Sequence, residues 1–172
     1  GPMPAVGGDQ IDVDEVFAKF KLGVAEQVDA NDSATHYDLG IAYDQMALYN
    51  DAIQEFRIAS RDPARHALCQ SMIGVIYEKL GMLGEAIDAY KSGLASPRLT
   101  HDEELALLYS LAGAWEARRN KREAIAALRR VVAIDPRYRN GDARSRLQAL
   151  EAPATGGSGT RRRDDIDAEL DA

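Results

Sequence analysis

The chain has 172 residues, a formal net charge of −7 and a sequence pI of about 5.0. This length is enough for one domain with a buried core. The acidic balance disfavours nucleic acid and anionic membranes as partners. Aromatic residues make up only 6% of the chain, and alanine and leucine are abundant. That composition favours helix-on-helix packing over a sheet, so we expect an all-α protein.

Few residues in the sequence point to chemistry or to a membrane. Cys69 is the single cysteine, so we expect no internal disulfide and a reducing, cytoplasmic location. No apolar run approaches the ~20 residues that cross a bilayer, and no signal peptide is recognisable. Gly1-Pro2 before Met3 is typical of a tag remnant. Because phosphate-binding loops, nucleophile motifs and metal-ligand spacings are missing, we expect no enzyme activity, cofactor or metal.

A repeat of 34 residues organises the middle of the chain. Gly40 and Gly74 lie 34 residues apart in the matching phrases Leu-Gly-Ile-Ala-Tyr and Ile-Gly-Val-Ile-Tyr. An Ala-Ile pair follows twelve residues after each glycine, and an aromatic residue comes four residues after each alanine. A third copy is in frame, with Ala112 at the glycine position and Ala124-Ile125 after it; about four residues are inserted around Pro97. This period is typical of stacked helix pairs.

Small residues at two fixed places let the helices of each pair approach closely. Each pair leaves an apolar face that the next pair buries. Asn31-Asp32-Ser33 offers N-caps for the first helix of the first repeat, and Thr100 or Asp102 can cap the helix that starts the third. Asn50-Asp51 is expected to open a helix, and Asp135-Pro136 is expected to end one. We expect paired helices at 33–47 and 49–61, 64–81 and 83–95, and 101–119 and 121–134.

The pattern resembles the tetratricopeptide repeat (TPR) family. The matching positions are Leu39, Gly40, Tyr43, Ala52, Phe56 and Ala59, then Ile73, Gly74, Tyr77, Ala86 and Tyr90, then Leu111, Ala112, Trp115, Ala124, Leu128 and Pro136. The resemblance implies a right-handed helical-repeat solenoid of three TPR helix pairs. The repeats would occupy about 33–66, 67–100 and 101–136.

The segments outside the repeats have distinct compositions. Within a TPR domain spanning 9–151, helices at 12–28 and 138–150 are expected to cap the two ends, with Leu147 and Leu150 facing the third repeat. Residues 1–8 are a tag remnant and lead, and 152–160 form a flexible linker. The C-terminal tail, residues 161–172, carries Arg162, Arg163, Ile166 and Leu170. It is either a solvated tail or a short amphipathic motif that docks in a groove, and its origin is either native or engineered.

The resemblance also implies a binding groove lined by the first helix of each repeat. The expected groove residues are Tyr37, Ile41, Asp44, Gln45, Ser71, Val75, Glu78, Tyr109 and Glu116. The chaperone-type TPR clamp has Lys and Asn where this chain has Tyr37 and Ile41, so we reject that ligand. A part-apolar, part-acidic groove with tyrosines suits an amphipathic helix that carries a few basic residues. The chain's own tail and a fused peptide are candidates for this helix, beside a separate partner.

For four further features of the sequence, a structural role is a better explanation than a catalytic, metal-binding or partner-binding role. His36 is expected to pack within its repeat, and Cys69 to be a buried apolar residue. Asp102-Glu103-Glu104 suits a helix start. The basic turn formed by Arg118, Arg119, Lys121 and Arg122 is expected to be solvated, with an acidic partner as the alternative.

We therefore predict a protein–protein interaction module, or alternatively a structural scaffold or dimerisation fragment of a longer TPR array. At a finer level, the phrases at 17–24 and 35–43 look like TPR arrays of gliding, pole-organising bacteria. That resemblance implies motility or polarity regulation, with a Ras-like GTPase or a polar regulator as the partner.

Overall fold

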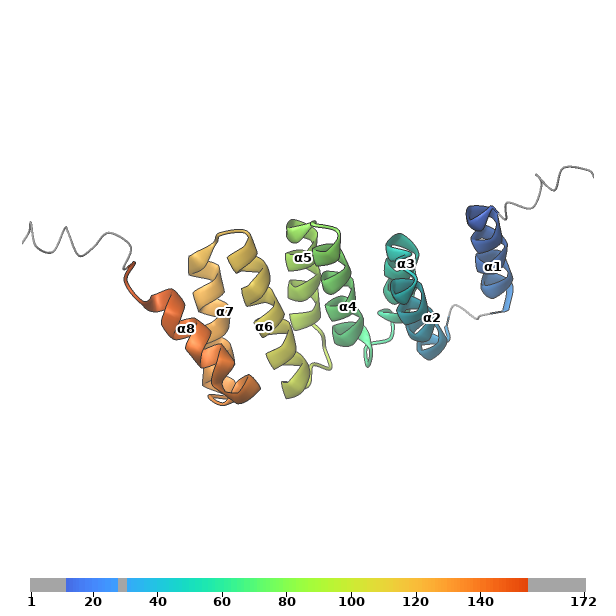
Figure 1. The fold of residues 1–172 in the computed structure, drawn as a ribbon. Helices are drawn as coiled ribbons and strands as arrows, with labels where there is room; N and C mark the ends of the chain where they lie inside the picture. The colour runs from blue at the N-terminus through green and yellow to red at the C-terminus, as the bar shows by residue number, and fades with distance from the viewer. Residues whose placement is uncertain (1–11, 28–30, 155–172) are drawn as a thin grey trace, which may run out of the picture. The chain divides into compact units, whose positions relative to one another are not determined.

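The computed structural model describes residues 12–27 and 31–154, which are helical almost throughout and contain no strand (Figure 1). The tail at 161–172 and most of the expected linker lie outside these residues. The helices are α1 (Val13–Gln27), α2 (Ser33–Gln45), α3 (Tyr49–Ala59), α4 (His66–Lys79), α5 (Leu83–Leu94), α6 (His101–Ala117), α7 (Lys121–Ile134) and α8 (Asp142–Glu151), with a short 3-10 helix at Tyr138–Gly141.

The helices divide between two compact units, which meet in sequence between Leu99 and Thr100. In the first unit, α2 packs on α3, α3 on α4, and α4 on α5. In the second unit, α6 packs on α7 and α7 on α8. The three expected helix pairs are therefore present, and the expected all-α helical-repeat fold is confirmed.

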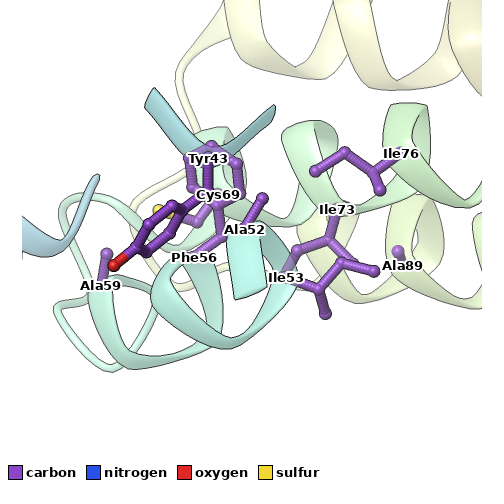
Figure 2. Packing of buried hydrophobic residues seen from close by; sticks show 9 residues of the cluster. All are labelled: Tyr43, Ala52, Ile53, Phe56, Ala59, Cys69, Ile73, Ile76 and Ala89. Carbon is purple, nitrogen blue, oxygen red and sulfur yellow. The ribbon is translucent and has the colours of Figure 1, made fainter. Parts of the chain in front are cut away.

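An aromatic ring lies directly over a glycine in each of the first two pairs. A Cβ atom on Gly40 would come within 2.6–2.8 Å of three ring carbons of Phe56, and one on Gly74 would clash with the Tyr90 ring in the same way. Both rings are fully buried. Figure 2 shows Phe56 within the core of the first unit, together with Tyr43, Ala52, Cys69 and their neighbours. The glycines are needed because the rings take the space of their side chains.

The turn inside each pair has one conformation in all three repeats. Its left-handed residue is Ala47, Gly81 or Arg119, with φ of 58°, 73° and 60° respectively. The backbone N–H of the next residue donates a hydrogen bond to the carbonyl five residues earlier, for example from Leu48 to Tyr43. Because of this turn, Leu48 is the N-cap of α3 in place of the expected Asn50-Asp51, and the helix begins at Tyr49, where the expected range 49–61 begins.

Side-chain caps set two of the helix starts that the sequence indicates. Asp32 accepts a hydrogen bond from the Thr35 backbone N–H at 3.0 Å, which begins α2. Thr100 and Glu103 form a reciprocal capping box at the start of α6. Such caps satisfy backbone donors that have no partner within the helix.

The C-terminal helix starts later than the sequence predicts. Arg139, Asn140 and Gly141 all have positive φ, at 50°, 57° and 86°. These residues break the expected helix at 138–150, so α8 starts at Asp142. Leu147 is buried as expected, and Leu150 is half-buried.

The N-terminal helix forms as expected, but much of its apolar face is uncovered. Lys21 Nζ lies 3.1 Å from Asp51 Oδ1 of α3. Val13, Val16 and Phe20 are 57%, 51% and 50% exposed, so these three side chains do not supply the buried cap that the sequence predicts. Within the described part of the chain, no helix combines the length and apolar character that crossing a bilayer requires.

The contact between glycine and aromatic ring can be tested with one methyl group. We expect Gly40→Ala to lower the free energy of unfolding by about 1–3 kcal/mol, because overpacking outweighs the helix-propensity gain of about 1 kcal/mol. Gly113→Ala is the control, since its Cβ would meet only Arg146 Nη2, at 3.9 Å. Urea unfolding followed by circular dichroism should show the first variant weakened and the second unchanged or stabilised. Equal stability of the two variants would contradict the packing argument.

Candidate functional site

Helices α2 and α4 of the first unit carry seven of the nine expected groove residues. Tyr37 and Ile41 are half-buried and pack against the hydrophobic core. Ser71 and Val75 of α4 are also half-buried, whereas Gln45 is exposed. We call the set Tyr37, Ile41, Asp44, Gln45, Ser71, Val75 and Glu78 the α2–α4 surface.

Tyr37 lies between an aromatic ring and a cation. Its ring centroid is 5.7 Å from that of Phe56, and the Arg65 guanidinium carbon is 5.9 Å from the Tyr37 centroid. Burial raises the pKa of the Tyr37 phenol, so the hydroxyl stays protonated at neutral pH. The side chain therefore offers apolar area together with a neutral hydrogen-bonding group.

The carboxylates of the α2–α4 surface already have partners within the first unit. Lys79 Nζ lies 2.9 Å and 3.1 Å from the two carboxylate oxygens of Asp44. Glu78 Oε2 accepts a hydrogen bond of 2.8 Å from the hydroxyl of the buried Tyr90. The surface is thus less acidic than the sequence predicts, because Lys79 offsets the charge of Asp44. Asp44 and Lys79 are 35 residues apart, one repeat plus one residue, and this spacing is the signal in the sequence that could identify the pair.

In the second unit, the expected groove residues Tyr109 and Glu116 are engaged by the C-terminal segment. Arg146 of α8 forms an ion pair with Glu116, and its guanidinium carbon lies 4.8 Å from the Tyr109 ring centroid. The Tyr109 hydroxyl donates to Asp142, and the Tyr138 ring meets the Tyr109 ring edge-on at 5.5 Å. The α8 segment therefore covers part of the surface that the sequence assigns to a ligand. Arg146 is the residue that the sequence prediction missed.

The buried polar groups of the first unit serve packing. His36 is 6% exposed, and its Nδ1 lies 2.5 Å from Glu55 Oε2, which agrees with the predicted packing role. His66 Nδ1 is a buried atom without a hydrogen-bond partner among the described residues. The described residues contain no group of three or more His, Cys, Asp or Glu side chains placed to hold a metal ion.

A comparison with protein families identifies the repeat. Residues 69–96, which include most of α4 and all of α5, match the tetratricopeptide repeat family model. The chain contains a tetratricopeptide repeat. This match confirms the assignment made from the sequence, and its 28 residues belong to the second predicted repeat. A search of curated proteins finds no match.

Solved TPR structures share the fold at low sequence identity. The first TPR of Spaghetti (RPAP3), bound to an HSP90 peptide, is 18% identical; the match covers 72% of this chain and 93% of that one, with a TM-score of 0.58. MamA is 22% identical, with coverage of 86% and 78% and a TM-score of 0.61. The type III secretion translocator chaperone SycD of Yersinia enterocolitica is 17% identical, with coverage of 76% and 90% and a TM-score of 0.57.

The thiol of Cys69 provides a test of core burial in the first unit. The side chain is fully buried, and this burial raises its pKa to about 12. At pH 8 the thiol is therefore protonated, and we expect the native chain to react with Ellman's reagent at least 100-fold more slowly than the chain in denaturant. Absorbance at the wavelength of the released thiolate measures both rates. Equal rates in native and denaturing buffer would contradict the buried position.

Proposed function

We propose that the chain is a protein–protein interaction module whose α2–α4 surface binds an amphipathic helix of a partner. The supporting observation is that Tyr37 and Ile41 of α2 and Ser71 and Val75 of α4 are half-buried and combine apolar area with hydroxyl groups. A helix that places apolar residues at i, i+3 or i+4 can contact such side chains. The Asp44–Lys79 pair joins α2 to α4 and favours a partner with charges of both signs.

The proposal is one of binding and not of catalysis. The Asp44 and Glu78 carboxylates already bond to Lys79 and to the Tyr90 hydroxyl. Groups held in this way orient and position a ligand, whereas a general acid or base must reach the proton that it transfers.

The partner class is narrower than the fold alone allows. The Spaghetti structure contains an HSP90 peptide, which supports peptides as a class of ligand for this fold. This chain has Tyr37 and Ile41 where the chaperone-type clamp has Lys and Asn. We therefore propose a ligand that is held by its apolar side chains and not by a C-terminal carboxylate.

The finer interpretation, motility or polarity regulation with a Ras-like GTPase or polar regulator as partner, stays a prediction. So does the chain's own tail as a mimic of the ligand on this surface. Cytoplasmic location likewise stays a prediction.

One substitution on α4 tests the binding surface. Helical peptides selected from a phage-displayed library against the full chain serve as probes. We expect Val75→Arg to weaken their binding at least tenfold, because a charged side chain replaces half-buried apolar area. Gln54→Arg on α3 is the control, since Gln54 is exposed and lies outside the α2–α4 surface. Isothermal titration calorimetry measures both affinities, and thermal melting confirms that both variants are folded. Equal affinities would reject this surface.

A scaffold or dimerisation role is the second candidate, and the exposed side chains of α1 favour it. Val13, Val16 and Phe20 are spaced for one helix face and are half exposed, which is typical of a helix that meets a partner. If this face drives self-association, Phe20→Lys should shift the chain toward monomer, and Asp14→Lys on the same helix should not. Light scattering across a concentration series measures the mass. A wild-type chain that is monomeric at every concentration would exclude dimerisation through this face.

A further inference from the structure

One side of α7 carries a hollow that is lined by basic and apolar side chains. It has a volume of about 570 Å³ and is lined by Lys121, Arg122, Ile125, Ala126 and Arg129. Lys121, Ile125 and Arg129 follow one another at four-residue intervals, so they share one side of the helix. We call this feature the basic hollow.

The charges of the basic hollow are poorly compensated. Among the residues that the structure describes, Lys121 and Arg122 form no ion pair, whereas Arg129 Nε lies 2.8 Å from Glu151 Oε1. Residues 100–154 contain ten Lys and Arg against eight Asp and Glu, whereas 12–99 contain eight against fourteen. The hollow is thus a cationic site in an acidic chain, and carboxylates are its natural complement.

The repeat pattern indicates that Ile125 should have an apolar neighbour. Ile53 holds the same position in the first repeat, where it is 4% exposed and clusters with Ile73 of the following helix, α4 (Figure 2). In the second unit α8 follows α7 and packs on it, as α4 packs on α3 in the first. Ile125 is nevertheless only half-buried. An additional apolar side chain on the hollow would therefore bury more of its surface.

The C-terminal tail has a composition that complements the basic hollow. Residues 164–171 contain five carboxylates, and Ile166 and Leu170 would share one side of a helix. We propose that this segment docks as a short helix on the basic hollow of its own chain. Ile166 and Leu170 then cover Ile125, and the flanking carboxylates face Lys121 and Arg122.

The connection is long enough and leaves the second unit at the right place. Glu151, the last residue of α8, contacts Arg129 at one end of the hollow. Asp164 comes ten residues after Ala154, and a chain of that length spans up to about 33–36 Å when extended. Lys121 and Arg129 are eight residues apart on a helix, or about 12 Å. A tether of this length gives an effective concentration near the millimolar range, so weak intrinsic affinity suffices for docking.

Charge favours the basic hollow over the α2–α4 surface as the docking place. The α2–α4 surface carries the carboxylates of Asp44 and Glu78, and within the described ranges only Asp44 is paired with a cation. The proposed helix, residues 164–171, contains five carboxylates and no Lys or Arg, so it would be repelled there. Arg161, Arg162 and Arg163 belong to the connection that precedes it. The proposed docking is also independent of the ligand proposed above, because it uses a different unit of the chain.

Zero-length cross-linking of the full chain locates the tail. A carbodiimide joins an amine to a carboxylate that touches it, and Lys121 is the single lysine after Lys91. We expect mass spectrometry to find the tail carboxylates joined to Lys121. In a mixture of ¹⁴N-labelled and ¹⁵N-labelled protein, both peptides of each cross-linked pair should carry the same isotope, because both come from one chain. Links to Lys79 would place the tail on the α2–α4 surface, and mixed-isotope pairs would make a second copy the occupant. Either result, or no link, overturns the proposal.

Hydrogen exchange with matched charge reversals supplies the second test. We expect Arg122→Glu to reduce amide protection of residues 164–171 at least fivefold, and Arg61→Glu in the first unit to leave it within twofold of wild type. Glutamate is favourable in the first turn of α7, so the first variant should fold normally. Replacing both Ile166 and Leu170 by serine should have the same effect as Arg122→Glu. Equal protection in the wild type and in all three variants would overturn the proposal. Val75→Arg, described above, tests only the α2–α4 surface, so the two proposals can fail separately.

Discussion

The fold of the first unit depends on two aromatic rings that occupy the space of missing side chains. Phe56 lies over Gly40 and Tyr90 over Gly74, so each helix pair closes to a distance that a methyl group would prevent. Close packing of this kind fixes the rotation of both helices, because a ring cannot enter its partner helix at another position. Ile53 of α3 and Ile73 of α4 then meet in one cluster that joins the first two pairs.

This packing also determines which residues remain for recognition. With Gly40 and Tyr43 turned into the core, Tyr37, Ile41 and Asp44 are left at the partly buried edge of α2. The second unit uses the corresponding edge of α6 differently, because Arg146 and Asp142 of α8 engage Glu116 and Tyr109. Among the described residues, one repeat pattern therefore produces a partly exposed edge in the first unit and an edge covered by α8 in the second.

The sequence is sufficient to predict the structural features that recur in each repeat, and it is insufficient to predict those that occur only once. The spacing of Gly40, Gly74 and Ala112 predicts the three helix pairs, because small residues recur at a fixed period where paired helices cross closely. The cover over Tyr109 cannot be predicted, since it depends on three left-handed residues that start α8 late and place Arg146. The exposed face of α1 escapes prediction for a similar reason, because an apolar stripe indicates a contact without naming the partner. The candidate groove residues rest on family positions alone, so the prediction did not include the pairing of Asp44 with Lys79, although their spacing of one repeat plus one residue is visible in the sequence.

The placement of two single residues gives each unit its own spectroscopic or chemical reporter. Cys69 is the only cysteine and lies in the core of the first unit, while Trp115, the only tryptophan, belongs to α6 of the second. Thiol accessibility therefore follows the opening of one unit, and indole emission follows the other. Repeat proteins derive stability from local interfaces and need not unfold in one step. The chain thus records, without added labels, whether its two units unfold together.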